Sequence, residues 1–405
     1  IGDQSIVAAQ SNIDNRGGLM LVEGDAAEIA SGAAILNSNG DVLHTGNGQL
    51  LLAAESGVDN TAGAMASRGQ LNVSTQSLNN DDGELLADSL LLNTASISNE
   101  HGAMEANAAT VIAEQSLNNR MGLIGSSESD LNIAGAAIDN QDGALLSSGA
   151  NVSIQSSELD NDRGVVLAEQ AVSLVSGQVN NQQGALIGNA GLSALVTKLN
   201  NSEGQISSGR DLSVIADQDI DNSLGLMEAA GAVQLWAAAL GNEAGVISSQ
   251  GLSENTRFIE ILLDGALNNS GGVIHQQNGD ILLVAGALNN TGGNIDQRGD
   301  GGLGIQAGIN NQSGRIQSEG QQWLVSSARL NNQQGALLSD SDLWIDSAEG
   351  LSNANGLMHA SEALMIASQS DIDNRSGYLR GDELMVDDER AVVVAHQLSL
   401  DHDVA

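Results

Sequence analysis

The chain has 405 residues, of which 51 are acidic and 13 basic, so its formal net charge is -38, and it contains neither cysteine nor proline. This charge would repel nucleic acid and anionic membrane surfaces, and a chain without cysteine has no disulfides and no thiolate metal sites. No apolar run approaches the roughly 18 residues of a membrane-spanning helix. The sequence opens at Ile1 in mid-pattern, as we expect of a piece of a longer protein.

One eight-residue motif recurs along the whole chain. It reads apolar, usually Asn or Asp, Asn, two variable residues, Gly, one variable residue, apolar, as in LNNQQGAL from Leu330 to Leu337. Its second Asn occupies Asn15, Asn37, Asn60, Asn80, Asn99, Asn119, Asn140, Asn161, Asn181, Asn201, Asn222, Asn242, Asn269, Asn290, Asn311, Asn332, Asn353 and Asn374. A period of about 21 residues is typical of solenoid arrays, and we expect one repeat rod over residues 1–377.

Apolar residues within each repeat follow the period of a strand. Ile, Leu or Val stands two residues before the repeated Asn, and Met, Leu, Ile or Val stands two residues after the Gly. An alternating segment follows, for example Leu131-Asn132-Ile133. Alternation with period two predicts strands with one buried face, joined by turns. The sequence therefore predicts an all-β, parallel β-solenoid of about 18 coils of about 21 residues, which at ~4.8 Å per coil makes a rod of roughly 86 Å.

The repeated Asn and Gly each suggest a structural role. The Gly is present in every copy, which indicates either a positive φ or a close backbone approach. The Asn position never holds Asp, although Asp is common one residue earlier. Carboxylates stacked every ~4.8 Å would repel each other by roughly 3 kcal/mol at an effective dielectric of 20, whereas an amide donates to one neighbour and accepts from the other. We therefore predict a buried asparagine ladder.

The repeat is interrupted in two places. Asn242 and Asn269 are 27 residues apart, and the surplus falls near residues 252–258, which include Phe258, the only phenylalanine. We expect a loop to project there. After residue 377 the motif stops, so residues 378–405 are expected to form a degenerate terminal coil or a cap.

The motifs LNNQQGAL, LDNDRGVV, IDNQDGAL and LNNTGGNI resemble the haemagglutinin repeats of filamentous-haemagglutinin-type exoproteins, over residues 13 to about 379. The resemblance implies a right-handed parallel β-helix that is secreted through an outer-membrane two-partner secretion transporter. It also implies an extracellular location at the surface of a Gram-negative bacterium and a role in virulence, in either an adhesin or a contact-dependent growth-inhibition toxin.

Two functions are compatible with these features. The chain is expected to be a rigid shaft that presents a distal binding or toxic domain to another cell. The alternative is that the segment itself binds a receptor or polysaccharide through Phe258 and the outward-facing Trp236 and Trp344, while Trp323 is expected in an inward apolar position. Arg-Gly-Asp occurs at residues 298–300 and 380–382, but the composition of the repeat explains it better than integrin binding does.

Catalysis is not expected. Polysaccharide-cleaving β-helices need carboxylates and basic residues that converge on adjacent coils, and here twelve Arg and one Lys are spread singly. No motif for a cofactor or a metal is present, and His396 and His402 are interpreted as part of a solvated tail. The sequence therefore predicts a protein that is not an enzyme.

Overall fold

The computed structural model describes residues 4–252, 258–388 and 394–395. Strands and turns make up these residues, and no helix occurs among them. The fold is a parallel β-solenoid of about 18 coils, with equivalent residues about 21 apart, which confirms the predicted fold class. The chain divides into two compact units, Ile1–Val196 and Thr197–Ala405. The right-handedness implied by the family resemblance stays a prediction.

The first unit contains eighteen complete strands. They are β1 (Gln4–Ala9), β2 (Ile13–Asp14), β3 (Leu19–Val22), β4 (Ala26–Ser31), β5 (Ala34–Leu36), β6 (Asp41–His44), β7 (Gln49–Ala54), β8 (Gly57–Asp59), β9 (Ala64–Asn79), β10 (Glu84–Ser98), β11 (Ala103–Asn118), β12 (Leu123–Ser126), β13 (Leu131–Asp139), β14 (Ala144–Ser147), β15 (Val152–Asp160), β16 (Val165–Ala168), β17 (Ala171–Asn180) and β18 (Ala185–Gly188). Strand β19 (Gly191–Asn200) contains the boundary between the units.

The second unit continues with shorter strands. They are β20 (Gln205–Ser208), β21 (Leu212–Ala216), β22 (Ile220–Asp221), β23 (Leu226–Ala229), β24 (Val233–Ala237), β25 (Leu240–Gly241), β26 (Val246–Ser249), β27 (Phe258–Leu263), β28 (Ala266–Asn268), β29 (Val273–Gln276), β30 (Asp280–Asn289), β31 (Asn294–Gln297), β32 (Leu303–Asn310), β33 (Arg315–Ser318), β34 (Gln322–Ser326), β35 (Leu330–Asn331), β36 (Ala336–Ser339), β37 (Leu343–Ser347), β38 (Leu351–Ser352), β39 (Leu357–Ala360), β40 (Ala363–Ser368), β41 (Ile372–Asn374), β42 (Tyr378–Arg380), β43 (Glu383–Asp388) and β44 (Val394–Ala395).

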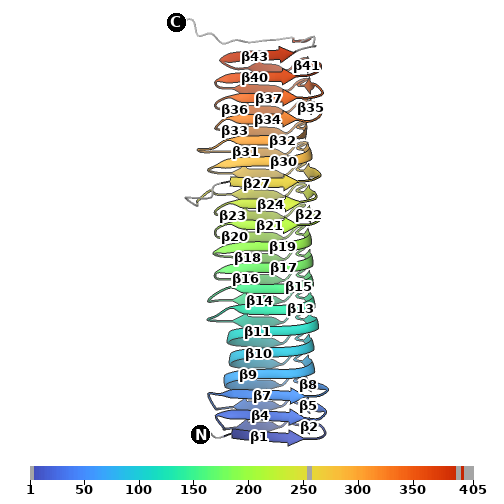
Figure 1. The fold of residues 1–405 in the computed structure, drawn as a ribbon, viewed down its shortest axis with the longest axis vertical. Coiled ribbons are helices and arrows are strands. Elements are labelled where there is room, and N and C mark those ends of the chain that lie inside the picture. The colour runs from blue at the N-terminus through green and yellow to red at the C-terminus, as the bar shows by residue number, and fades with distance from the viewer. Residues whose placement is uncertain (1–3, 253–257, 389–393, 396–405) are drawn as a thin grey trace. The chain divides into compact units, whose positions relative to one another are not determined.

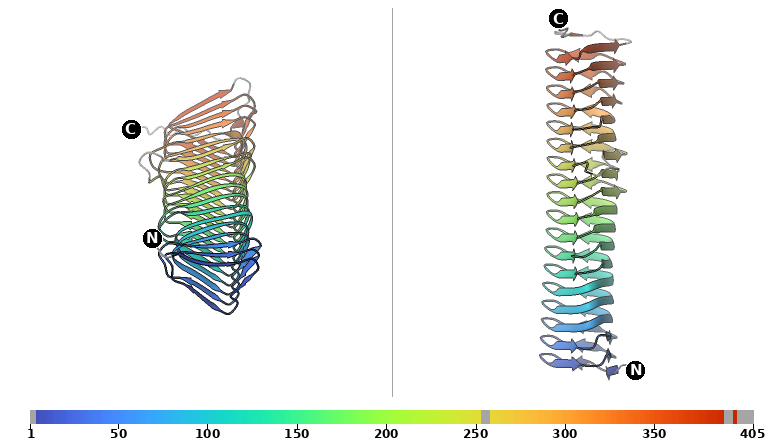
Figure 2. Two further views of the ribbon diagram at one scale, coloured as in Figure 1. Left: turned by 60° about the horizontal axis from the view of Figure 1, so that its bottom comes forward. Right: turned by 90° about the vertical axis from the view of Figure 1, so that its left-hand side faces the viewer.

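Within each unit, equivalent strands of successive coils lie one above the other (Figures 1 and 2). A typical coil of the second unit has a strand after the glycine (β20), a longer strand (β21) and a short strand before the asparagine (β22), which pair in parallel with β23, β24 and β25 of the next coil. In the first unit the three segments fuse into single strands in β9, β10 and β11, which pair in parallel along most of their length. Backbone hydrogen bonds therefore join each of these coils to the next.

The core is built from stacked columns of aliphatic side chains. Residues two before the ladder asparagine, such as Ile220 and Leu330, and two after the glycine, such as Met227 and Leu337, are at most 1% exposed. The alternating residues of the long strands, such as Leu343 and Ile345, also point inward, as period-two alternation requires. Because every coil repeats the same pattern, apolar contacts continue from coil to coil within each unit.

One inward position of the second unit carries an amide instead of an aliphatic group. Gln322 pairs with Leu343 in the ladder of long strands and is 1% exposed, yet neither its side-chain oxygen nor its side-chain nitrogen has a hydrogen-bond partner. Leaving a buried amide without partners costs about 1 to 3 kcal/mol. The nearest positions of this column are occupied by leucine, at Leu303, Leu343 and Leu364.

Replacing Gln322 with Leu is expected to stabilise the second unit by about 1 to 3 kcal/mol, because it removes the unpaired amide and keeps the side-chain volume. The thermal midpoint, followed by circular dichroism, should rise. The matched control is Gln306→Leu, at an exposed position of an adjoining strand, which should leave the midpoint nearly unchanged. A Gln322→Leu midpoint at or below that of the parent chain would contradict this assignment.

Two predicted features fall partly outside the described residues. Residues 253–257 of the expected loop lie outside them, as do residues 389–393 and 396–405 at the end of the chain. Within the described part, β42 and β43 pair in parallel with β39 and β40, so residues 378–388 continue these two stacks of strands past the last Asn and Gly of the motif. That the terminal segment acts as a cap stays a prediction.

Candidate functional site

The repeated asparagines form hydrogen-bonded chains in the interior of each unit. Asn37, Asn60, Asn80, Asn99, Asn119, Asn140 and Asn161 each donate from Nδ2 to the Oδ1 of the next asparagine along the chain, at 2.7 or 2.8 Å. Asn15, in the first coil, makes the same bond to Asn37 and is half-buried. The others are completely buried. The donors therefore all point in one direction along the first unit.

The second unit repeats this arrangement. Asn201, Asn222, Asn242, Asn269, Asn290, Asn311, Asn332 and Asn353 each donate to the following asparagine at 2.7 Å, ending at Asn374. The longer step from Asn242 to Asn269 keeps this distance. The extra residues are therefore accommodated elsewhere in that coil.

Each amide nitrogen also holds the turn that follows it. In the coil of Asn161, Nδ2 lies 3.1 Å from the carbonyl oxygen of Gly164 and 3.3 Å from that of Ala185 in the next coil. The Asn161 carbonyl accepts from the backbone nitrogen of Gly164 at 3.0 Å. Every acceptor around this nitrogen is an oxygen, so an aspartate oxygen in its place would face oxygens. This environment explains why Asn and not Asp occupies the position.

The glycine of the motif is required by a close backbone approach and not by its φ angle. A Cβ on Gly164 would lie 2.1 Å from the carbonyl oxygen of Asn140 in the preceding coil and 2.6 Å from Oδ1 of Asn161. The left-handed conformation belongs to the residue before it, such as Met121 (φ 52°) and Leu224 (φ 58°), where side chains are tolerated. Of the two explanations that the sequence allowed, the close approach is therefore correct.

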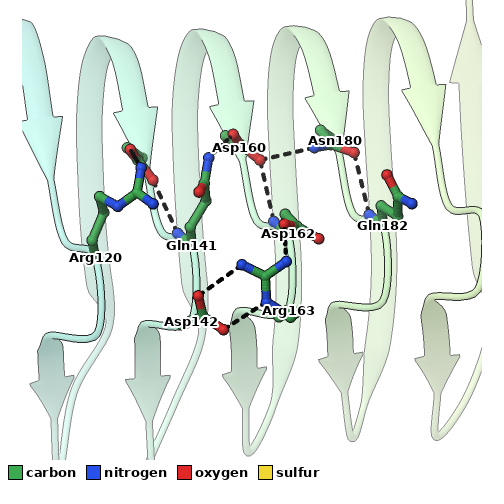
Figure 3. Close-up of polar contacts among 9 residues, drawn as sticks. Arg120, Gln141, Asp142, Asp160, Asp162, Arg163, Asn180 and Gln182 are labelled. Atoms are coloured by element: carbon green, nitrogen blue, oxygen red, sulfur yellow. Dashed lines mark hydrogen bonds and ion pairs between the residues drawn. The ribbon is translucent and has the colours of Figure 1, made fainter.

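The outer side of the same turn explains the Asn or Asp that precedes most of the ladder asparagines. Oδ1 of Asp160 accepts from the backbone nitrogen of Asp162 at 3.2 Å, and Asn180 caps Gln182 in the same way, as Figure 3 shows. This is an Asx turn, for which either residue type serves because only the oxygen is used. Asn180 also donates to Asp160 of the preceding coil at 2.9 Å. The outer column is thus tolerant of Asp where the inner column is not.

Arginines bridge the exposed turns of neighbouring coils. Arg163 binds Asp142 through two nitrogens at 2.8 and 2.9 Å and also contacts Asp162 (Figure 3). This hydrogen-bonded guanidinium lowers the pKa of Asp142. In the first coil, the hydrogen bond from Arg16 lowers the pKa of Asp14 to about 2. The carboxyl groups whose pKa is lowered therefore belong to surface ion pairs. Such pairs are typical of solvated turns and not of a catalytic centre.

The aromatic candidates for partner contact all belong to long-strand positions of the second unit. Trp236 and Trp344 face outward and are 42% and 49% exposed. Phe258 begins β27, is half-buried and pairs with Asp280. The structure places Trp236 and Trp344 in different coils that are not adjacent, so the three residues form no single cluster.

The expected inward position of Trp323 is wrong. Trp323 is 63% exposed, and the preceding residue, Gln322, occupies the inward position. Trp323 instead pairs with Trp344 across β34 and β37, so the two indoles lie in adjacent coils on the outer face. The signal was present in the sequence, because Trp323 and Trp344 are one repeat period, 21 residues, apart and thus equivalent.

The Arg-Gly-Asp segment at residues 298–300 is engaged within the chain. Nε of Arg298 donates to Oδ2 of Asp296 at 2.9 Å, and the backbone nitrogen of Gly299 donates to Oε2 of Glu319 at 2.7 Å. Nδ1 of His275 lies 3.3 Å from the same Asp296 oxygen. These contacts give the tripeptide a role in the packing of adjacent coils.

Two further properties concern the described residues alone. They include no group of three or more His, Asp or Glu side chains arranged to hold a metal ion. Among the same residues no helix is long and apolar enough to cross a membrane.

Comparison with known families identifies the repeat. Residues 45–120 and 128–223 match the family described as the haemagglutinin repeat. Searches among curated proteins and among solved structures gave no match. Outside the matched ranges, the same motif and ladder continue from Asn242 to Asn374. The coils outside the matched ranges are thus built from the same repeating unit as the matched segments.

Proposed function

The chain is a haemagglutinin-repeat β-solenoid of the filamentous-haemagglutinin type, and on this premise we propose that it is the rigid shaft of a large secreted bacterial exoprotein. In this role it holds a distal binding or toxic domain away from the producing cell and presents it to another cell. The observation that carries the proposal is the hydrogen-bonded ladder, because each coil is tied to the next by a buried amide as well as by backbone bonds. A shaft needs this repeated coupling and no pocket.

The family context supports the remaining parts of the proposal. Haemagglutinin-repeat proteins are generally associated with two-partner secretion, so we propose export through an outer-membrane transporter to the surface of a Gram-negative cell. Coil-by-coil templating would favour folding as the chain leaves the pore. We also propose that the chain is not an enzyme, since the shifted carboxyl groups lie in solvated turns.

A shaft further requires that the two units form one continuous rod. The step from Asn181 to Asn201 is 20 residues, like other steps within each unit, so the sequence continues the period across the boundary. Small-angle scattering of the purified chain should give one rigid rod of roughly 86 Å, at ~4.8 Å per coil. A variant lacking residues 162–181, one whole period, should remain folded as a slightly shorter rod.

The control deletion removes residues 162–171, half a period. It shifts each later inward residue out of its column and should therefore unfold the first unit. A compact particle, two bodies joined by a flexible hinge, or equal tolerance of both deletions would contradict the shaft proposal.

A further inference from the structure

The outer face of the long strands in the second unit carries two neighbouring columns of apolar side chains, which we name the apolar strip. One column contains Ile215, Trp236, Leu262 and Val284, and the other contains Leu282, Trp323, Trp344, Met365 and Met385. Pairing of successive strands places Ile215, Trp236, Leu262 and Val284 in register, and likewise Trp323, Trp344, Met365 and Met385. All three tryptophans of the chain lie in this strip.

The solenoid itself does not require apolar residues at these positions. In the first unit, the position equivalent to Trp323 and Trp344 is apolar at Leu51 and Leu91, but it is polar in four successive coils, at Thr110, Asn132, Ser153 and Ser173. In the strip, Trp323 is 63% and Met385 60% exposed. The two columns are interrupted once, at Gly304 and Gln306, and are otherwise apolar over several successive coils. Exposed apolar residues gathered in this way mark an interaction site more often than scattered ones do.

The strip is hollowed where the two tryptophans and two methionines meet. A groove of about 340 Å³ is lined by Trp323, Trp344, Asp346, Met365 and Met385. Asp346 is exposed beside Trp344, at an outward position of the same strand. The groove thus combines two indoles, flexible thioethers and one carboxylate. Methionine adapts its shape to varied apolar ligands, and indole faces attract cations.

Charge decides among the possible partners. The chain carries a net charge of -38, and the charged residues in the two columns between residues 212 and 386 are Glu260 and Asp346, both acidic. Polyanions and anionic lipid surfaces are therefore disfavoured. A second copy would bring a like charge of -38 against the strip. A neutral glycan would place its hydroxyls against methionine, leucine and valine, which offer no hydrogen bonds.

We propose that the apolar strip is a docking surface for a polypeptide segment that combines apolar side chains with Arg or Lys. Its apolar side chains fill the groove beside Met365 and Met385. Its cationic groups stack on Trp323 and Trp344 and approach Asp346. This surface is independent of the shaft role, so its failure leaves the rod proposal unaffected.

Intrinsic fluorescence provides a direct test, because every tryptophan of the chain lies in the strip. An amphipathic Leu/Lys peptide of about 18 residues that lacks Trp is the probe. It should bind saturably, shift the tryptophan emission to shorter wavelength, and bind less tightly as sodium chloride is raised. A Leu/Glu peptide of the same pattern and the neutral oligosaccharide maltoheptaose should not bind.

The variant Trp323→Ser/Trp344→Ser installs the serine that earlier coils carry at this position. Calorimetry should show the Leu/Lys peptide binding about tenfold or more weakly to it. Leu224→Asn, at an exposed turn outside the strip, should bind within about twofold of the parent chain. Equal peptide affinity of the double variant would overturn the proposal. Binding of maltoheptaose or of the Leu/Glu peptide, or self-association that the double variant abolishes, would likewise overturn it.

Discussion

Replacing Asn161 with Asp is expected to lower the free energy of unfolding of the first unit by about 3 to 5 kcal/mol at pH 7, the cost of an unpaired buried charge. The side chain is completely buried, and its Nδ2 donates to Oδ1 of Asn181 at 2.7 Å. A carboxylate oxygen at that point would face the oxygens of Asn181 and Gly164. Only the bond that Asn161 accepts from Asn140 would survive. Thermal or urea unfolding measures the loss.

The pH dependence of this variant follows from the sign of the expected shift. Burial and facing oxygens should raise the folded-state pKa of the new aspartate above its unfolded value of about 3.9. Between these two pKa values the folded state binds more protons, so stability falls as pH rises through this window. The destabilisation should therefore be full above the folded pKa and should largely disappear near pH 4, where the protonated acid can donate to Asn181.

The matched control for this variant is Asn118→Asp in the outer column. Oδ1 of Asn118 caps the backbone nitrogen of Arg120 at 3.1 Å, and an aspartate oxygen can do the same. The side chain is half-buried and lies near a cation. A change of no more than about 0.5 kcal/mol is expected, as for other surface positions. If the unfolding midpoint of Asn161→Asp equalled that of the control at pH 7, the stabilising role assigned to the asparagine ladder would be contradicted.

The fold could be predicted from the sequence because a solenoid repeats one set of contacts. The role of a residue that occurs once is ambiguous. An Asn that occupies the same position in every coil, where Asp never occurs, shows that this environment requires an amide and excludes a carboxylate. The period also fixes the register, since Leu343 and Leu364 are equivalent by counting alone. Parallel stacking of equivalent residues then follows, and with it the aliphatic columns of the core.

Local exceptions could not be predicted by residue type. Trp323 is apolar and was expected to point inward, yet the register set by the neighbouring coils places Gln322 there. A buried amide without partners is unfavourable, so hydrophobicity alone would place Trp323 and not Gln322 in the interior. Counting from Trp344 gives the correct one. The period is thus stronger evidence than hydrophobicity wherever the two disagree.

The apolar strip emerges only when the columns are compared across coils. Each of its residues stands alone in the sequence, between inward residues of its own strand, and resembles ordinary surface variation. In space, Trp344 and Met365 adjoin because β37 and β40 pair. Ser153 and Ser173 occupy the equivalent position in earlier coils, which shows that the fold accepts polar residues there. The interaction surface is therefore separable from the structural repeat, which allows one to be altered without the other.

Replacing Gly164 with Ala is expected to destabilise the first unit by about 3 kcal/mol or more, at the upper end of overpacking effects. The new Cβ would lie 2.1 Å from the backbone carbonyl oxygen of Asn140. Backbone cannot rotate away as a flexible side chain can, so the two coils must separate. The carbonyl oxygen belongs to Asn140, a member of the ladder. Separation of the coils should therefore also weaken the hydrogen bond from Asn140 to Asn161. Chemical unfolding of the variant measures the effect.

Two Gly→Ala controls separate the possible causes of this loss. Gly125 has an ordinary φ, and a Cβ there would lie no closer than 3.9 Å to Glu105, so Gly125→Ala should be neutral or stabilising by about 0.4 to 1 kcal/mol. Gly292 has a φ of 63° and open space around it, so Gly292→Ala tests the left-handed conformation alone. It should cost about 1 kcal/mol. If Gly292→Ala were as damaging as Gly164→Ala, backbone conformation and not the approach of adjacent coils would account for the glycine of the motif.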